Sequence, residues 1–312
     1  MALELSAALI AGPCRDRCQR VVDALCAQTA LQSIEIVIVD LARDCVPRLK
    51  TPPEVPVVYV SRYDIERWGT ARLEAVRAAH SPVVAFIEDH CFPARDWASR
   101  LIDAYQGPWV AVGYAFTNAN PKSYVSRVAI LARYGLFVHP ARGGRAHYLS
   151  GNNISYKREV LLALGDRLES LLDIDFNLHQ ELIRAGLPLF VEARALAAHQ
   201  NYTSLSGECR AGRPYCRLLA ARRARGGAWG RPRQIVYGLL TPLGAPAVRL
   251  ARLAYSLVGR HSLWSQFAVG LPAIVIMYLS DAVGESLGYL LGVGNAEREV
   301  VRYELEAERC SI

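Results

Sequence analysis

Ser81–His90 reads SPVVAFIEDH, a run of apolar residues that ends in two acids and a histidine. The run does not alternate between apolar and polar residues, which is typical of a strand buried on both faces of a parallel sheet. Three ionisable side chains directly after such a strand are unfavourable unless they are solvated, paired or bound to a ligand. Carboxylates with an imidazole suit a divalent cation, so Glu88, Asp89 and His90 are candidate ligands; the alternative is that they cap the next turn.

Apolar runs of strand length occur on both sides of this stretch, and segments with helical spacing separate them. The predicted strands are 5–11, 34–39, 55–60, 83–87, 109–116 and 189–192, and the predicted helices are 15–29, 70–79, 158–164 and 173–185. Alternation of strands and helices predicts an α/β fold with a parallel sheet. Ligands of such sheets bind at the carboxyl ends of the strands.

The charge is unevenly distributed over the 312 residues, whose net charge is +7. Eleven arginines and no acid lie between Arg210 and Arg260. This block indicates an anionic partner, either phosphates, acidic lipid headgroups or nucleic acid, and the alternative is a solvated basic face. We do not expect nucleic acid, because the block lacks a nucleic-acid motif and adjoins apolar helices.

Two apolar stretches, 235–258 and 267–293, follow the arginine-rich block. The second is long enough to span a bilayer, but Asp281 and Glu285 lie within it, and an acid at the bilayer centre costs about 2.5–3.5 kcal/mol. We therefore predict helices that lie in or dip into the cytoplasmic leaflet, with arginines such as Arg249 meeting anionic headgroups. The alternative is a helical lid packed on the soluble domain.

These changes in composition divide the chain into three predicted parts. They are an α/β domain over 1–207, an arginine-rich connector over 208–234 and a C-terminal apolar or amphipathic helical segment over 235–312. The eight cysteines contain no C-x-x-C pair, so they are interpreted as reduced thiols of a cytosolic protein. The N-terminal residues lack the basic region of a secretory signal and are interpreted as the first strand.

Several motifs resemble, in the same order along the chain, those of the family 2 glycosyltransferases of the GT-A fold. Residues 69–97 (GTARLEAVRAAHSPVVAFIEDHCFPARDW) are similar to that family's stretch from an arginine-bearing helix to its D-x-D strand. Residues 149–165 (LSGNNISYKREVLLALG) and 173–186 (DIDFNLHQELIRAG) resemble its acceptor-side loop and its E-D helix. The resemblance spans residues 5–202 and implies a GT-A fold with a mixed, mostly parallel sheet, followed here by membrane-associated helices.

The resemblance implies an inverting transferase that moves a sugar from a nucleoside-diphosphate sugar to a hydroxyl acceptor. By position, Asp40 contacts the nucleotide base or ribose, and Arg72, Glu88 and Asp89 bind the donor. A divalent cation, Mn²⁺ or Mg²⁺, is implied, and its candidate ligands are Asp89, His90 and His199.

The acceptor side of the implied site contains amides and carboxylates. Asn152 and Asn153 lie where an acceptor hydroxyl is bound. Asp175 stands eleven residues before a glycine, at the position of the family's catalytic base. Asp173 is the alternative base, and Asp175 could instead cap its helix. Arg213, together with neighbouring arginines, could clamp the leaving diphosphate or face a lipid phosphate.

The finer resemblance is to a bacterial subgroup of surface-polysaccharide assembly, with E-D-H in place of D-x-D. From the C-terminal segments we expect a lipid-linked acceptor and a location in the cytoplasm, peripheral to or embedded in the inner face of the cell membrane. The competing hypothesis is a non-catalytic sugar-nucleotide-binding or scaffolding protein of the same fold, because His90 and Ile174 replace acids of the family pattern. A Rossmann dehydrogenase is disfavoured, since no G-x-G-x-x-G follows the first strand.

Overall fold

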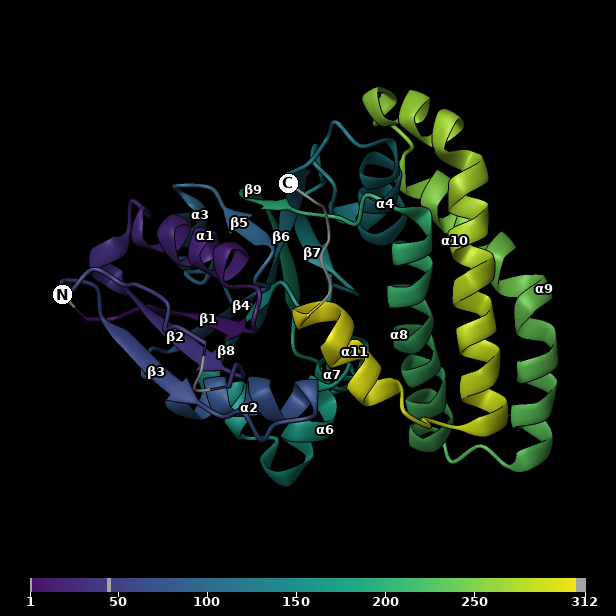
Figure 1. The fold of residues 1–312 in the computed structure, drawn as a ribbon, viewed down its shortest axis with the longest axis horizontal. Helices are drawn as coiled ribbons and strands as arrows, with labels where there is room; N and C mark the ends of the chain where they lie inside the picture. Colours follow the sequence, from purple (N-terminus) through teal and green to yellow (C-terminus); the bar gives the residue numbers. More distant parts are fainter. Residues whose placement is uncertain (1, 44–45, 307–312) are drawn as a thin grey trace. The chain divides into compact units, whose positions relative to one another are not determined.

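The computed structural model describes residues 2–43 and 46–306, which divide into two compact units (Figure 1). Unit 1 comprises Met1–Ala119 and Phe137–His199, and unit 2 comprises Asn120–Leu136 and Gln200–Ile312. The break after His199 lies close to the predicted domain end at residue 207. Sequence analysis does not predict that residues 120–136 group with the C-terminal part, because that grouping depends on how one helix packs against others distant in the chain.

Within the described residues, nine strands form one sheet in unit 1, in the order β3-β2-β1-β4-β8-β6-β9-β5, with β7 paired to β9. The strands are β1 (Leu5–Ala11), β2 (Ile34–Asp40), β3 (Val57–Ser61), β4 (Val83–Ile87), β5 (Cys91–Pro93), β6 (Ala111–Asn118), β7 (Gly144–Ala146), β8 (Ile154–Lys157) and β9 (Leu189–His199). Strands β8, β5 and β7 are antiparallel to their neighbours, and the remaining strands share one direction. The sheet is therefore mixed and mostly parallel.

Burial explains why the apolar runs form the central strands. Every residue of β1, β2 and β4 is buried, as expected for strands covered on both faces. The helices of unit 1 are α1 (Arg15–Cys26), α2 (Trp68–Ala78), α3 (Trp97–Ala104), α5 (Arg158–Leu162), α6 (Leu168–Leu172) and α7 (Asp175–Arg184). The predicted helices at the start of the chain and before β4 are thus confirmed, with shifts of a few residues at their ends.

Strand β9 is longer than the predicted strand 189–192. It continues to His199, because its second half pairs with β6 after a register shift and also with β5. The pairing with β5 places His199 opposite Cys91, the residue that follows the E-D-H triplet. A histidine far along the chain is in this way brought to the end of β4.

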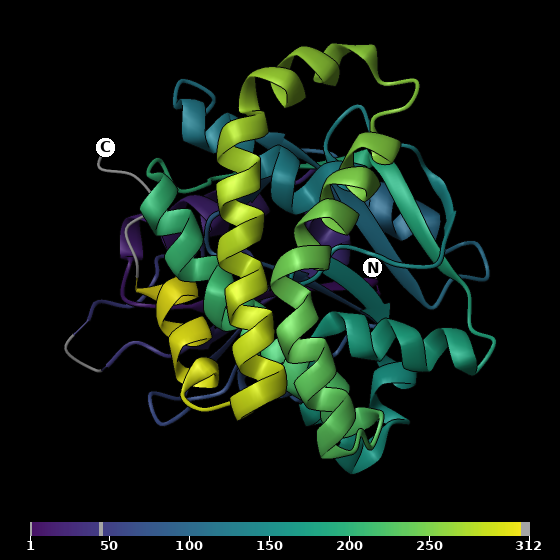
Figure 2. The same ribbon diagram turned by 90° about the vertical axis from the view of Figure 1, so that its right-hand side faces the viewer.

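Unit 2 is helical in the described residues. Its helices are α4 (Tyr124–Tyr134), α8 (Leu205–Gly226), α9 (Arg231–Ser256), α10 (Trp264–Leu291) and α11 (Ala296–Leu305). Helices α8, α10 and α9 lie side by side in both views (Figure 2). Most of the stretch predicted as an arginine-rich connector is therefore part of the long helix α8, which packs against α10.

The two acids of α10 do not face solvent. Asp281 and Glu285 are buried, and Arg249 of α9 donates to both carboxylates, at 2.9 and 2.8 Å. Arg133 of α4 also pairs with Asp281, and Arg223 of α8 with Glu285. The prediction that Arg249 meets lipid headgroups is therefore not borne out, because this guanidinium neutralises the acids of α10.

Among the described residues, one helical segment, His261–Leu291, is long and apolar enough to cross a bilayer. The same length and composition are found in core helices of soluble proteins, and 44% of its most apolar window is buried within the structure.

The cysteines whose placement is described are free thiols. Cys45 and Cys310 lie outside the described residues.

Candidate active site

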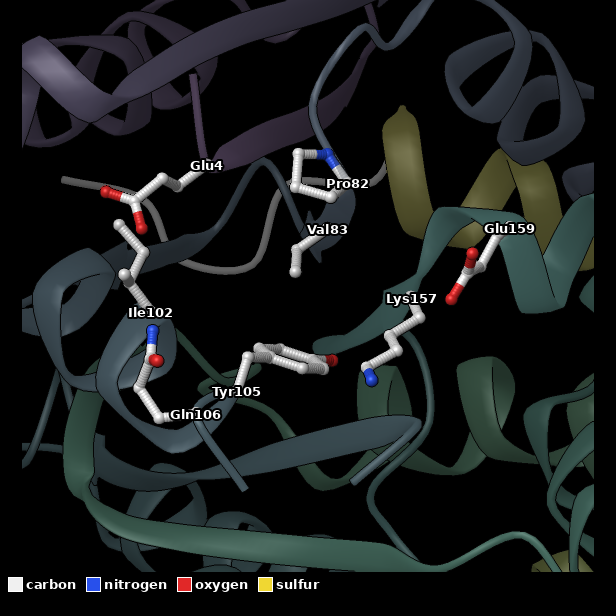
Figure 3. Close-up of a pocket in the computed structure, with 8 residues that line it drawn as sticks. All are labelled: Glu4, Pro82, Val83, Ile102, Tyr105, Gln106, Lys157 and Glu159. Atoms are coloured by element: carbon white, nitrogen blue, oxygen red, sulfur yellow. The ribbon is translucent and has the colours of Figure 1, made fainter. Parts of the chain in front are cut away.

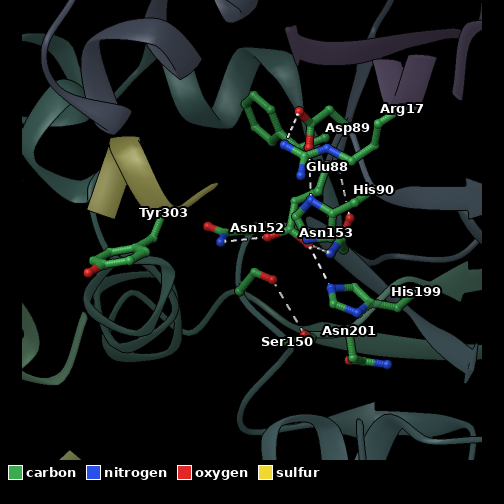
Figure 4. A network of polar contacts seen from close by, with 12 residues as sticks. Arg17, Glu88, Asp89, His90, Ser150, Asn152, Asn153, His199, Asn201 and Tyr303 are labelled. Atoms are coloured by element: carbon green, nitrogen blue, oxygen red, sulfur yellow. Dashed lines mark hydrogen bonds and ion pairs between the residues drawn. The ribbon is translucent and has the colours of Figure 1, made fainter. Parts of the chain in front are cut away.

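The polar site of unit 1 lies at the carboxyl end of β4. Glu88, Asp89 and His90 follow directly after Ile87, and all three are at most 4% exposed. His199, the last residue of β9, lies beside them (Figure 4). The triplet predicted from the sequence is thus located where ligands bind in such sheets.

Glu88, His90 and His199 form a cluster able to hold a metal ion. Nε2 of His90 and Nε2 of His199 lie 3.4 and 3.3 Å from Oε2 of Glu88. One ligand atom from each residue falls within 4.8 Å of the other two. Burial alone would raise the pKa of Glu88, but the two neighbouring imidazoles lower it well below its usual value. The carboxylate of Glu88 is therefore ionised.

Asp89, predicted as a metal ligand, has a different environment. Its Oδ2 accepts from Arg17 of α1 at 2.7 Å, and its Oδ1 lies 2.8 Å from Nδ1 of His90. The Asp89 carboxylate at Nδ1 orients the imidazole of His90 so that Nε2 faces Glu88. The structure thus places Glu88, instead of Asp89, with the two histidines, while Asp89 orients His90.

Asn152 and Asn153, predicted to bind the acceptor, both contact Glu88. Nδ2 of Asn152 donates to Oε1 of Glu88 at 2.8 Å, and Nδ2 of Asn153 donates to Oε2. Oδ1 of Asn153 accepts from the backbone N–H of Glu88 at 3.0 Å. Asn152 has φ +64°, a left-handed conformation that asparagine tolerates better than most residues. The loop is therefore fixed against the candidate metal ligand.

Asp175 is the centre of a second buried network. Arg72 of α2 donates to both carboxylate oxygens at 2.8 and 2.9 Å, and Arg72 itself is 1% exposed. Tyr156 Oη and the backbone N–H of Asn152 also donate to Asp175, at 2.8 and 2.7 Å. Burial by itself would raise the pKa of Asp175, but the guanidinium outweighs it and the pKa is lowered.

This network excludes the N-cap interpretation of Asp175. The N-cap of α7 is Ile174, and no side-chain cap bond is present there. The carboxylate instead reaches Arg72, whose guanidinium carbon lies 4.1 Å from the ring centroid of Phe86 in β4. Arg72, predicted to bind the donor, therefore joins α2, β4 and α7.

Tyr156 connects Asp175 to His179. Because its single hydroxyl proton is donated to Asp175, its oxygen accepts from Nε2 of His179, 2.9 Å away. Burial lowers the pKa of His179 to about 4, so its imidazole is neutral at physiological pH.

The alternative base, Asp173, also contacts an arginine. Its Oδ2 accepts from Arg67 at 2.6 Å, and its Oδ1 accepts from the backbone N–H of Gly69 at 2.9 Å. Arg67 is about a third exposed, so this pair is closer to solvent than the pair of Arg72 and Asp175.

Asp40, predicted to contact the nucleotide base or ribose, lies at the end of β2. Arg15 of α1 donates to its two oxygens at 3.0 and 2.6 Å, and Tyr59 Oη and the backbone N–H of Ala42 donate as well. In this arrangement the Arg15–Asp40 pair, and not Asp40 alone, presents the polar groups at this strand end.

Arg213, predicted to bind the donor diphosphate, belongs to unit 2. It lies on α8 and donates to Ser280 Oγ of α10 at 3.2 Å. Its diphosphate role stays a prediction.

A cavity of about 330 Å³ elsewhere in unit 1 is not part of this site (Figure 3). It is lined by Glu4, Val83, Tyr105 and Lys157, among others. Glu4 precedes β1 and Val83 begins β4, so the cavity lies at the amino ends of these strands, whereas the E-D-H triplet follows the carboxyl end of β4.

Arg17, Tyr156 and His179 were not predicted as site residues from the sequence. Their contacts depend on tertiary packing, since Arg17 reaches Asp89 across 72 positions of the chain. The spacing of Asp175 and His179, four residues apart on one helix, is the local signal that could have indicated a pair.

Comparison with known proteins supports the resemblance. The family described as "Glycosyl transferase family 2" matches residues 14–165. A search of curated protein sequences finds no match.

Solved structures are similar at low sequence identity. A mannosyltransferase, PcManGT from Pyrobaculum calidifontis, in complex with GDP-Man and Mn²⁺, has a TM-score of 0.60 at 16% identity, covering 93% of this chain and 88% of that one. S. aureus TarS 1-349 in complex with UDP has a TM-score of 0.43 at 15% identity, covering 62% of this chain and 59% of that one.

The first of these likenesses confirms the predicted GT-A-like α/β fold. The family match includes α1, β4 and β8, and hence the E-D-H triplet and both asparagines. The chain is thus a glycosyltransferase, and its residues 14–165 match the family described as "Glycosyl transferase family 2".

Proposed function

We propose that this glycosyltransferase transfers a sugar, with inversion, from a nucleoside-diphosphate sugar to a hydroxyl acceptor, in a reaction that depends on a divalent cation. The observation that carries the proposal is the buried cluster of Glu88, His90 and His199 at the carboxyl end of β4. The cluster lies at a ligand-binding position of the fold. Glu88 and His90 are within the stretch that matches the family, and His199 lies beyond its end.

The three side chains of the cluster fit a divalent cation, which when bound would offset the charge of the donor diphosphate. Two nitrogens and one carboxylate suit Mn²⁺ better than Mg²⁺, which prefers oxygen ligands. Asp89 holds the imidazole of His90 in the orientation that exposes Nε2 to the cluster, and Arg17 balances the charge of Asp89. PcManGT binds GDP-Man, so GDP-mannose is the first donor to test.

Asp175 is the proposed base, which removes the proton from the acceptor hydroxyl as that oxygen attacks the anomeric carbon. Its ionised form, stabilised by Arg72, is the form that accepts a proton. The backbone N–H of Asn152 donates to Asp175, and its side-chain amide donates to Glu88. The same residue therefore positions the proposed base and the candidate metal ligand.

The acceptor is proposed to be lipid-linked, and the enzyme to act in bacterial surface-polysaccharide or glycolipid assembly at the inner face of the cell membrane. Exposed apolar side chains on α9 and α10 and the arginine-rich sequence of unit 2 support this location.

The test is a thermal-shift screen of nucleoside diphosphates and their sugars, beginning with GDP and GDP-mannose, each with Mn²⁺, Mg²⁺ or EDTA. Only ligands that bind the folded state raise the melting temperature. Release of nucleoside diphosphate in the presence of Mn²⁺ then measures turnover, and Glu88→Gln is expected to abolish it. The matched control is Asp64→Asn, an exposed acid paired with Arg62 at the surface.

A non-catalytic sugar-nucleotide-binding protein is the second candidate, and one observation favours it. The carboxylate of Asp175 accepts from Arg72, Tyr156 and Asn152, which makes it a weak base. Nucleotide-dependent stabilisation without turnover for any donor would favour this candidate over the transferase.

A further inference from the structure

Helices α9 and α10 of unit 2 carry large apolar side chains of which at least 40% of the surface is exposed. We call these side chains the α9–α10 apolar surface. They are Ile235, Val236, Tyr237, Leu239, Leu240, Leu243 and Val248 on α9, and Val269, Ile276, Leu279 and Val283 on α10. Their exposure ranges from 40 to 78%. Single exposed apolar residues are ordinary, but a group of this size on adjacent helices marks an interaction site.

The exposed residues belong to one helix pair. Helices α9 and α10 run side by side (Figure 2), and Ser286 Oγ of α10 donates to the carbonyl of Gly238 on α9 at 2.6 Å. On α10 the exposed positions Ile276, Leu279 and Val283 follow a spacing of three and four, which is one stripe of a helix.

The acids of α10 are directed away from this stripe. Asp281 and Glu285 are buried against arginines of α4, α8 and α9, so the exposed stripe itself carries no charge. If α10 crossed a bilayer on its own, these ion pairs would break and two acids would enter hydrocarbon, which is strongly unfavourable. The helix therefore fits a position along the membrane surface better than a position through it.

The charged side chains that α9 and α10 themselves expose are all positive. Helix α9 contains no Asp or Glu, and Arg231, Arg233 and Arg252 are exposed near its two ends. Aromatic side chains stand at the far end of α9 and the start of α10, where Tyr255 is 80% exposed and Trp264 is 38% exposed. An apolar centre with arginine and aromatic flanks is complementary to an anionic lipid surface. Against a second copy of the chain the same arginines would repel one another.

We propose that unit 2 binds the surface of an anionic lipid bilayer through the α9–α10 apolar surface, with α10 lying in the interface and not crossing it. The proposal rests on the membrane location given above and identifies the surface that provides it. It does not depend on sugar transfer.

The test is flotation of the full chain with vesicles of phosphatidylcholine, with and without phosphatidylglycerol. Leu239→Glu combined with Leu243→Glu is expected to weaken binding to both kinds of vesicle by at least about tenfold, because two charges replace inserted apolar groups. Arg231→Gln combined with Arg233→Gln is expected to weaken binding to the anionic vesicles alone, by about fivefold for each arginine. The matched control is Leu162→Glu, an equally apolar residue of unit 1 that is 40% exposed.

Crossing is tested in the vesicle-bound chain with Ser265→Cys, at the start of α10, and Asn295→Cys, four residues beyond its end. Both are expected to react with a membrane-impermeant maleimide added outside, as read by mass spectrometry of the labelled peptides. Protection of one end would overturn the statement that α10 does not cross.

Three results would overturn the lipid assignment. They are unchanged flotation of the double leucine variant, an equal loss in the Leu162→Glu control, or a lipid-free dimer that the leucine substitutions dissociate while flotation persists. The nucleotide-dependent melting shift is recorded for each variant, so loss of lipid binding with an intact shift is separated from failure of the proposed transferase function.

Discussion

At the residue scale, Asn152 joins the two buried networks of unit 1. Its side-chain amide donates to Glu88, its backbone N–H donates to Asp175, and its Oδ1 accepts from Trp68 Nε1 at 3.1 Å. The residue makes all three bonds in a left-handed backbone conformation, at φ +64°. A single position thus orients both the candidate metal ligand and the proposed base.

Two substitutions separate the conformation of Asn152 from its amide. Asn152→Gly removes the side chain but tolerates positive φ, whereas Asn152→Ala removes it and adds strain of about 1–2 kcal/mol. We expect the alanine variant to be the less stable by that amount in urea denaturation. Both variants should bind Mn²⁺ more weakly than the parent chain. Equal stability of the two would contradict the role given to the backbone conformation.

Substitution of each aspartate by asparagine tests whether Asp175 or Asp173 is the catalytic base. Asp175→Asn is expected to lower kcat by about 10²–10⁴ if it removes the base. It should also destabilise the fold by about 3–5 kcal/mol, because Arg72 is then buried without its counter-charge. Asp173→Asn should cost less stability, since Arg67 is partly exposed. An Asp175→Asn enzyme that melts earlier but keeps its kcat would assign the base elsewhere.

The sequence predicts which residues gather at the end of β4 but not which of them point at one another. Glu88, Asp89 and His90 are recognisable because charged residues follow an apolar run. Their directions differ because Arg17, from another helix, pairs with Asp89, and the amides of the asparagine loop engage Glu88. These partners are distant in the chain, so no local sequence pattern predicts the contacts.

At the element scale, helices α8 and α10 are in close contact at two glycines of α10. A Cβ on Gly284 would lie 2.2 Å from the carbonyl oxygen of Arg213, and one on Gly288 would lie 2.3 Å from that of Arg217. The partners are backbone atoms, which cannot rotate away as a side chain can. The absence of side chains at these positions is therefore what allows the two helices to pack.

We expect Gly284→Ala to destabilise unit 2 by about 1–3 kcal/mol, although alanine is the better helix former. The control is Gly244→Ala on α9, where a Cβ would meet nothing within 4 Å. That variant should be as stable as the parent, or more stable by up to about 1 kcal/mol. Thermal denaturation of both variants measures the difference, and an equally stable Gly284→Ala variant would show that the helices are farther apart than described.

Elements with a strong periodic signal are predicted well, and elements defined by pairing are not. The strands β1, β2 and β4 are recognisable in the sequence as continuous apolar runs, because both faces of each strand are buried. The second half of β9 and the short strand β5 exist only because they pair with each other and with β6. The acids within α10 are visible in the sequence, but their arginine partners are visible only in the packed helices.

At the scale of the whole molecule, stability should fall with acid in two stages. His179 has a pKa of about 4 in the folded chain and about 6.5 when unfolded, so below about pH 6.5 the unfolded chain binds a proton that the folded chain does not. This lowers the free energy of unfolding by up to about 3 kcal/mol between pH 6.5 and 4. Asp175, whose pKa is lowered, contributes stability that is present above pH 4 and is lost at still lower pH.

Urea denaturation at a series of pH values measures both stages. His179→Gln should flatten the dependence between pH 6.5 and 4, because a neutral amide replaces the titrating ring while still donating to Tyr156. An unchanged slope in this variant would show that another histidine is responsible.

The arginine–acid network of unit 2 has a consequence for how the chain is made. Arg133, Arg223 and Arg249 all precede Asp281 and Glu285 in the sequence, so the ribosome synthesises every arginine partner before either acid. When the most apolar helix of the chain emerges, the groups that neutralise its acids already exist. The order of synthesis therefore favours completion of the helical unit over the release of an isolated apolar segment that a membrane-insertion machinery could bind.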